Sequence, residues 1–299
     1  MSDTEVDLTD ERYDKHREAG EILAQVREET VKKIDIGVTH LEVAEFAEER
    51  IRELGGEVGF PVNISVDEVA AHDTPDRDDE RTFGEEMINI DLGVHVDGWL
   101  ADTAVTVDFS GHDQLVEASA EALEAAIERI RPGVETGEIG AAIESTIDGY
   151  GYNPVVNLTG HALEHWNQHA EPNIPNRAVA QGIELEAGQV IAIEPFATDG
   201  GGKVTEGNRT EIYKLDREDV PVRDRRARAA LEQITEEFRT LPFATRWLDT
   251  RRPEMAIRRL EQHGIIDGYP ILKEDDGYLV SQKEHTVIVT ETGCEVTTL

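Results

Sequence analysis

The sequence predicts an α+β fold in which two related halves share a central, antiparallel-rich sheet and a helical insertion interrupts the second half. Three observations lead to this prediction. The order helix, helix, strand, strand occurs twice, matching strands of the two halves end on carboxylates, and the second copy contains a long extra segment. A chain of 299 residues has room for about two domains. We therefore expect a two-fold pseudo-symmetric domain, residues 1–211 and 273–299, and an inserted helical subdomain, residues 212–272.

The first half is predicted to begin with two helices. Apolar residues at helical spacing mark the first, from about residue 10 to residue 33. Thr39 and Glu42 have the spacing of a capping box, which starts the second helix, and Gly55 ends it.

The second half repeats this helical pattern. A helix is predicted from about residue 113 to residue 130, followed by a turn at Pro132-Gly133. Thr136 opens another amphipathic segment, which Gly149 stops.

The segments that follow the helices also match between the halves. The matching pairs are 61–65 with 154–159, 88–91 with 191–194, and 102–107 with 284–289. The members of the last pair lie much further apart in the chain than the members of the first two. The second half must therefore hold an insertion, and residues from about 215 to 272 have the pattern of helices.

Composition excludes several classes of protein. Lys and Arg number 29 against 64 Asp and Glu, a formal net charge of −35, which argues against a specific DNA-binding protein because phosphate neutralisation needs a basic surface. An acidic, lysine-poor surface on a folded chain favours solubility at high salt, where charges are screened, so we expect a halophilic source. The single cysteine, Cys294, cannot form an internal disulfide.

We expect neither a signal peptide nor a membrane-spanning segment. Residues 1–5 lack the basic and apolar regions of a signal peptide, and no apolar run approaches the ~18 residues that span a bilayer. The expected location is the cytoplasm, without a membrane partner.

Four carboxylates occupy matching places in the two halves. Asp91 and Asp102 lie on one predicted hairpin, and the repeat brings Glu194 and Glu284 to the facing positions. Singly, each acidic residue could be a turn or cap residue, but four converging carboxylates require about four positive charges, which two divalent cations supply. His161 reaches the same face and offers a nitrogen ligand, so the set suits Mn, Fe(II), Co or Zn.

The chain resembles the methionine aminopeptidases of the type II subclass, a family with the two-fold pseudo-symmetric "pita-bread" fold. The resemblance covers almost the whole chain in order and spacing. The segments that carry it are 63–75, 90–93, 100–104, 157–169, 192–196 and 281–286.

The resemblance implies a function for each matching residue. Five residues match the metal ligands of the family: Asp91, Asp102, His161, Glu194 and Glu284. Of these, Asp102 and Glu284 match the ligands that bridge two divalent ions (Co, Mn, Fe or Zn). His72 and His169 match the histidines that contact the substrate amide, and Glu194 matches the residue that transfers a proton. Residues at the positions of the methionine pocket are Phe60, Phe196, Tyr269 and Leu272, and the alternative for the two phenylalanines is a place in the core.

The implied activity is removal of the N-terminal methionine from nascent polypeptides when the second residue is small. Two alternatives remain open at this point: a proline-specific aminopeptidase or prolidase, which resemble chains with an extra N-terminal domain, and a non-catalytic binding module of the same fold. All five matching ligands are present, which argues against the second alternative.

Arginine is concentrated in the predicted insertion. Two clusters comprise Arg223, Arg225, Arg226 and Arg228, and Arg251, Arg252, Arg258 and Arg259. They could pair with nearby carboxylates on the helices, or they could form a basic patch that faces the ribosome.

Overall fold

A computed structural model describes residues 6–218 and 220–299 of the chain. Residues 1–5, whose composition argues against a signal peptide, lie outside the described part. Among the described residues, no helix is both long and apolar enough to cross a bilayer.

The helices begin and end close to the predicted positions. They are α1 (Glu11–Lys33), α2 (His40–Glu53), α3 (Asp113–Ile127), α4 (Thr136–Gly149), α5 (Arg225–Gln233) and α6 (Pro253–Gln262), with a π-helical turn at Ile234–Phe238 and a 3₁₀ turn at Thr245–Trp247. The predicted capping box starts α2: the Thr39 hydroxyl accepts a hydrogen bond from the Glu42 amide at 3.1 Å, and the Glu42 carboxylate accepts one from the Thr39 amide at 3.2 Å.

The strands form two matching sets and two smaller sheets. Their bounds are β1 (Glu57–Val66), β2 (Val69–Ala71), β3 (Met87–Val96), β4 (Trp99–Asp108), β5 (Asn153–Pro154), β6 (Thr159–Glu164), β7 (Asn167–Pro175), β8 (Val190–Ile193), β9 (Phe196–Thr198), β10 (Thr205–Leu215), β11 (Phe243–Ala244), β12 (Ile266–Lys273), β13 (Val280–Gln282), β14 (His285–Val289) and β15 (Cys294–Val296).

The two halves meet where β4 lies beside β14. The first half forms the sheet β1-β3-β4 and the second forms β15-β14-β8-β6-β7, and neighbouring strands in both are antiparallel. The Glu284 amide donates to the Ala104 carbonyl at 3.1 Å, and the Thr286 hydroxyl donates to the Asp102 carbonyl at 2.8 Å. These bonds join the halves as the repeat predicted.

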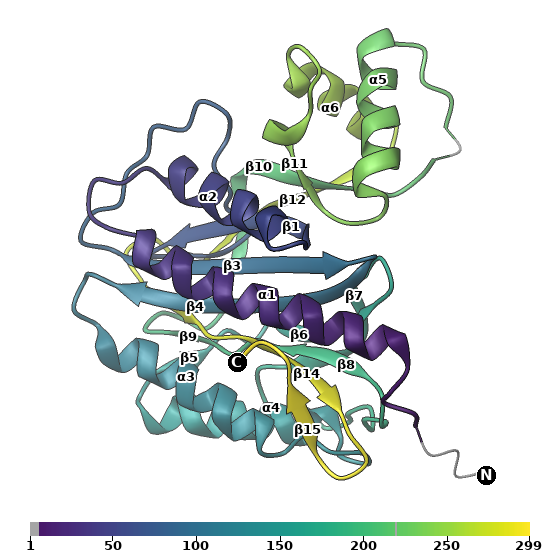
Figure 1. The fold of residues 1–299 in the computed structure, drawn as a ribbon. Helices are drawn as coiled ribbons and strands as arrows, with labels where there is room; N and C mark the ends of the chain where they lie inside the picture. The colour runs from purple at the N-terminus through teal and green to yellow at the C-terminus, as the bar shows by residue number, and fades with distance from the viewer. Residues whose placement is uncertain (1–5, 219) are drawn as a thin grey trace.

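Helices cover one face of this sheet, and α1 crosses in front of β3 and β4 in Figure 1. Along β3, Ile88, Ile90 and Leu92 are buried in one apolar cluster with residues of α1 and α2. Because successive side chains of a strand point to opposite faces, Asn89 and Asp91 face away from the helices. The helix-free face is thus the one that holds the predicted carboxylates.

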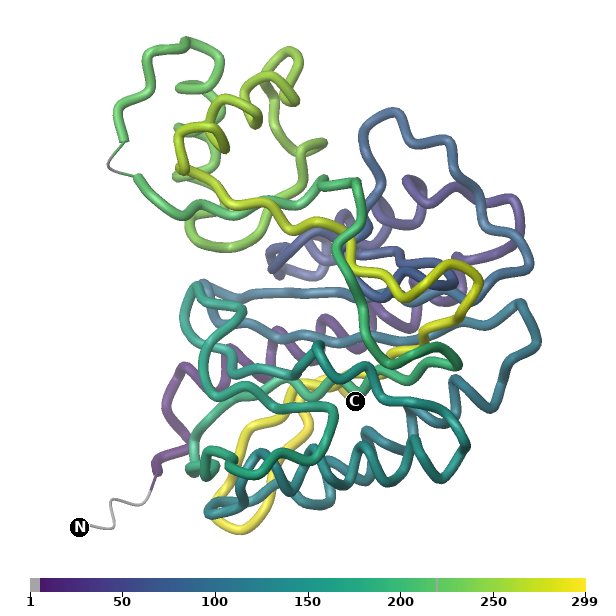
Figure 2. The backbone as a smooth tube through the Cα atoms, turned by 180° about the vertical axis from the view of Figure 1, so that it is seen from behind, coloured from purple at the N-terminus to yellow at the C-terminus, as the bar shows by residue number. Residues whose placement is uncertain are grey.

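The predicted insertion has helices only at its centre. α5 and α6 pack around their own apolar core, which includes Phe243 and Leu260, and both views show them standing apart from the sheet (Figures 1 and 2). The helical prediction is wrong for residues 266–272, because β12 occupies them and pairs with β10 and β2. Pro270 is incompatible with a helix interior, and the strand partner lies far upstream in the chain, beyond the reach of local periodicity.

Figure 2 shows β10 and β12 running side by side from the sheet towards the helices. The division into residues 1–211 with 273–299 and residues 212–272 stays a prediction. Its boundaries fall inside these two strands.

Candidate metal centre

Asp91 and Asp102 lie on one face of the β3–β4 hairpin. Asp91 pairs with Ala104, and Asp102 pairs with Gly93, so the two acidic residues are diagonal neighbours in the ladder. Paired residues point to the same side of a sheet, as do residues two apart on one strand. The hairpin therefore places both carboxylates on the helix-free face.

Glu194 and Glu284 occupy the equivalent place in the second half. Ile193 and His285 form the last pair of the β8–β14 ladder, and the two glutamates are the residues directly beyond it. His161 lies on β6, opposite Ala192 of β8. Three strands of the second half thus bring two carboxylates and an imidazole to the carboxylates of the first.

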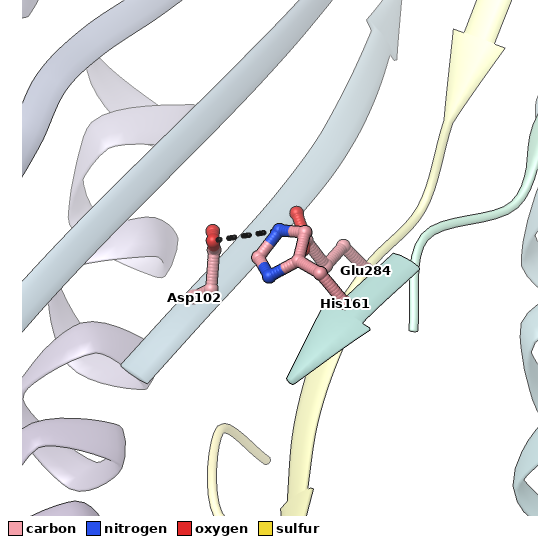
Figure 3. Close-up of side chains that lie close together, drawn as sticks. All are labelled: Asp102, His161 and Glu284. Carbon is pink, nitrogen blue, oxygen red and sulfur yellow. Dashed lines mark ion pairs between the residues drawn. The ribbon is translucent and has the colours of Figure 1, made fainter. Parts of the chain in front are cut away.

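Three of these side chains form a compact group (Figure 3). The nearest ligand atoms of Asp102, His161 and Glu284 all lie within 4.8 Å of one another, and all three residues are buried. The His161 Nε2 atom is 3.9 Å from Asp102 Oδ2 and 3.7 Å from Glu194 Oε1. Four of the five predicted ligands, Asp102, His161, Glu194 and Glu284, therefore lie close together.

The four carboxylates of this cluster have raised pKa values. Burial raises the pKa of Asp91 to about 7. Burial, together with the charges of neighbouring carboxylates, raises the pKa of Asp102, Glu194 and Glu284 well above the usual range. Burial also lowers the pKa of His161 to about 4, so its imidazole is neutral near pH 7.

These residues fit divalent cations. Asp91 Oδ1 and Asp102 Oδ1 are buried without a hydrogen-bond partner among the described residues, although a buried carboxylate oxygen normally has one. The Nδ1 atom of His161 lies 3.4 Å from the Ala162 carbonyl, which leaves the Nε2 lone pair facing the carboxylates. Four carboxylates and one neutral imidazole form an oxygen-rich set with the charge to hold two divalent ions.

A cavity of about 280 Å³ opens beside the cluster. Its lining includes all five predicted ligands, both predicted substrate histidines and three of the four predicted pocket residues, Phe60, Phe196 and Tyr269. Leu272 is the exception, because it does not line the cavity and packs against an apolar cluster that contains Phe196. Leu272 lies three residues beyond Tyr269 on β12, where the pairing of this strand with β2 becomes irregular.

The two histidines border the cavity, and both lie near Tyr269. The ring centroid of Tyr269 lies 5.2 Å from that of His72 and 6.0 Å from that of His169, and the His169 ring lies 4.6 Å from His161. His72 Nδ1 is 3.2 Å from the Pro270 carbonyl. A carbonyl only accepts, so Nδ1 carries the hydrogen of the neutral ring and Nε2 is left as an acceptor. Burial lowers the pKa of His72 to about 4, which keeps this ring neutral.

Sequence reasoning missed several residues of the site. Ile212 and Pro242 line the cavity from the segment predicted as an insertion, and no local pattern marks them. Gln168 donates to Asp102 Oδ2 and Gln282 donates to Glu194 Oε2, each at 3.4 Å. Gln282 could have been found, because it lies two residues before Glu284 within the same motif.

The chain matches the model of metallopeptidase family M24 over residues 14–291. A methionine aminopeptidase of Archaeoglobus fulgidus is 50% identical over 292 residues, which cover 97% of this chain and 100% of that protein. The methionine aminopeptidase of Methanocaldococcus jannaschii is 47% identical over 96% of this chain and 99% of its own length.

Solved structures share the fold. The methionine aminopeptidase of Rickettsia prowazekii superposes with a TM-score of 0.71 at 22% identity, covering 97% of each chain. The prolidase of Pyrococcus furiosus superposes with a TM-score of 0.63 at 18% identity, covering 97% of this chain and 64% of that one. The matching family model and the near full-length archaeal relatives show that this chain belongs to metallopeptidase family M24.

Proposed function

We propose that this chain is a metal-dependent methionine aminopeptidase, which hydrolyses the first peptide bond of polypeptides that begin with methionine. The observation that carries the proposal is the position of the carboxylate and imidazole cluster. It lies in the wall of a cavity that also contains Phe60, Phe196 and two neutral histidines. The apolar part of this wall suits an unbranched side chain, and the polar part suits the peptide bond and the free amino group. The preference for a small second residue remains part of the proposal.

The ligand set Asp91, Asp102, His161, Glu194 and Glu284 would hold two divalent cations, which lower the pKa of water and polarise a carbonyl. Glu194 is the ligand best placed to move a proton. Its side chain is 14% exposed and lines the cavity, whereas that of Asp102 is 3% exposed. Its carboxylate takes a proton from the attacking water and returns it to the leaving amine.

The two histidines act on the scissile amide. His72 presents Nε2 as an acceptor, so it binds the N–H of the scissile bond. His169 lies on the His161 side of Tyr269, close to the ligand cluster, and donates a hydrogen bond to the carbonyl oxygen. Together they orient the bond between the two groups.

The test is hydrolysis of short peptides by purified protein supplied with Mn²⁺ or Co²⁺. A Met-Gly peptide, a Met-Leu peptide and a Gly-Pro peptide are compared, each with and without a chelator. The proposal expects metal-dependent release of methionine from Met-Gly and little from Met-Leu. Cleavage of Gly-Pro alone would indicate the proline-specific alternative, and cleavage of none would indicate a binding module.

We further propose that the enzyme works in the cytoplasm on nascent chains and that the insertion contacts the ribosome. All eight clustered arginines are exposed, and none forms an ion pair with a carboxylate in the described part of the chain. This argues against the helix ion pairs considered as an alternative. We call this surface the arginine patch: Arg223, Arg225, Arg226, Arg228, Arg251, Arg252, Arg258 and Arg259. Exposed guanidinium groups suit bidentate contacts with RNA phosphates.

Co-sedimentation with ribosomes tests this role of the arginine patch. The double variant Arg251→Gln with Arg252→Gln is compared with Arg129→Gln and Arg131→Gln, which change the net charge equally at exposed positions after α3. Loss of sedimentation in the first variant alone supports docking through the patch. Equal sedimentation of both variants and the unaltered protein refutes it.

A further inference from the structure

The backbone of His72 has a strained conformation. Its φ is 66°, in the left-handed region that non-glycine residues rarely adopt. Such a conformation is energetically unfavourable and persists only where surrounding contacts enforce it. The contacts on either side of this residue therefore decide where its ring points.

The residue after His72 is held by two arginines. The Asp73 side chain is 5% exposed, and its two oxygens accept from Arg81 Nη1 at 2.7 Å and from Arg209 Nη1 at 2.8 Å. The same two arginines bind Asp79, whose side chain is 3% exposed, at 2.7 Å and 3.2 Å. We call these four residues the Arg–Asp clamp.

The Arg–Asp clamp holds two carboxylates and two guanidinium groups, and the more exposed Asp76 also lies 3.5 Å from Arg209. Two buried carboxylates face two guanidinium groups, and each carboxylate contacts both arginines. The clamp lies outside the ligand set, and its members do not line the cavity. Its contacts thus hold the chain in place and do not add a charge to the reaction.

The two arginines of the clamp connect the loop to different parts of the fold. Arg81 belongs to the same loop as Asp73, so its bonds fold the loop on itself. Arg209 belongs to β10, whose partner β12 supplies both Tyr269 and the carbonyl of Pro270. One pair of strands therefore holds the His72 ring through Pro270 and the following backbone through Arg209.

We propose that Arg209 is a positioning residue for His72: by binding Asp73 it holds the strained backbone so that His72 Nε2 faces the scissile amide. The proposal rests on the function proposed for His72 above. Without the Arg209 bond, the loop keeps its internal Arg81 contacts but loses this attachment to β10. The ring then moves relative to Tyr269, and misplacement of such a group by about 1 Å can cost up to 10²-fold in rate.

The experiment is a double-mutant cycle between Arg209→Gln and His72→Ala. Kinetics on a Met-Gly peptide, bound metal and the thermal midpoint are measured for each variant. Arg209→Gln is expected to lower kcat about 10-fold or more with KM changed less than about threefold, and with metal content unchanged. In the His72→Ala background the same change is expected to have less than a twofold effect on kcat, because no ring remains to be positioned.

Arg50→Gln provides a matched control. The Arg50 side chain is 27% exposed, against 26% for Arg209, and it binds Glu29 at 2.7 Å away from the cavity. Its kcat should equal that of the unaltered protein. Arg209→Lys retains a positive charge near Asp73 and should restore part of the lost rate. If Arg209→Gln fails to fold, Arg209→Lys replaces it in the double-mutant cycle, and the expected loss of kcat is smaller.

A measurement that does not depend on activity separates this proposal from the proposed function. The side-chain ¹⁵N–¹H NMR signal of His72, identified by its absence in His72→Ala, should shift in Arg209→Gln and stay in place in Arg50→Gln. An unmoved signal overturns the proposal, as does a loss of kcat from Arg209→Gln that is equally large without His72. Failure of the unaltered protein to cleave Met-Gly overturns the proposed function alone, while a shifted signal still supports the clamp.

Discussion

Removing one carboxylate from the metal cluster should stabilise the metal-free protein and weaken its response to metal. The change is Glu284→Gln, which keeps the size of a side chain that is 1% exposed. In the metal-free protein, burial and then the charges of neighbouring carboxylates raise the pKa of Glu284. With cations bound, the same charge becomes favourable. Glu284→Gln should therefore stabilise the metal-free protein and destabilise the metal-bound protein.

The magnitude follows from the distance between the charges. Ligand atoms of Asp102 and Glu284 lie within 4.8 Å, which corresponds to a repulsion of about 3 kcal/mol at an effective dielectric constant near 20. This repulsion is complete only when both groups are ionised. Below its pKa in the folded state, each group binds a proton and relieves the repulsion. The stabilisation of the metal-free protein by Glu284→Gln should therefore increase with pH. At high pH the thermal midpoint of the variant should lie about 5–10 °C above that of the unaltered protein.

Calorimetry of both proteins at pH 7 and pH 9, at constant high salt, measures this effect. One series contains chelator and the other contains excess Mn²⁺. The expected result is a higher midpoint for Glu284→Gln in chelator, and a rise on adding Mn²⁺ that is large for the unaltered protein and small for the variant. Two results would refute this account of the cluster. One is a thermal midpoint in chelator that is lower for the variant than for the unaltered protein at both pH values, and the other is an equal rise in midpoint for both proteins on adding Mn²⁺.

The remaining predictions concern salt, acid, the substrate histidine and the inserted core. Because the net charge is −35, dialysis from about 2 M to 0.05 M KCl should abolish the helical circular dichroism signal, and an unchanged signal and melting temperature would reject a need for salt. Burial opposes ionisation of Asp79, but hydrogen bonds from Arg81 lower its pKa to about 2. Its contribution, about 1 kcal/mol after solvent screening, should be complete above pH 4 and lost as the pH falls towards 2, and Asp79→Asn should flatten that part of a urea-denaturation pH series. His72→Ala should keep its metals by elemental analysis while kcat falls about 10²–10⁴-fold, and loss of metal would instead make this residue a ligand. Phe243→Ala should cost about 3–5 kcal/mol in denaturant unfolding, since the side chain is fully buried in the core of the inserted helices, and a loss below 1 kcal/mol would mean that this core is loosely packed.

Local signals in the sequence were reliable where their cause is local. The capping box of Thr39 and Glu42 depends on atoms three residues apart, and the helix it predicts begins there. The repeat was equally informative, because two copies of one pattern must fold alike and meet across a common axis. The carboxylates of both halves could therefore be expected on one face, where the structure brings them within reach of His161.

Side-chain direction was less predictable where register matters. Tyr269 lines the cavity and Leu272 does not, although both were expected there. The difference depends on how β12 pairs with β10, and β10 contains two irregularities in that pairing. A strand partner so far away in the chain leaves no trace in local periodicity.

The sequence was enough to identify the repeat, the paired helices and the groups that could bind metal, because these follow from short spacings and from the cost of burying charge. The folded structure was needed to show that β10 and β12 connect the inserted helices to the cavity and that Ile212 forms part of its wall. It also decided that Arg209 reaches across to Asp73 beside His72. Such contacts form between segments far apart in the chain, and their energy depends on the folded arrangement of the whole chain.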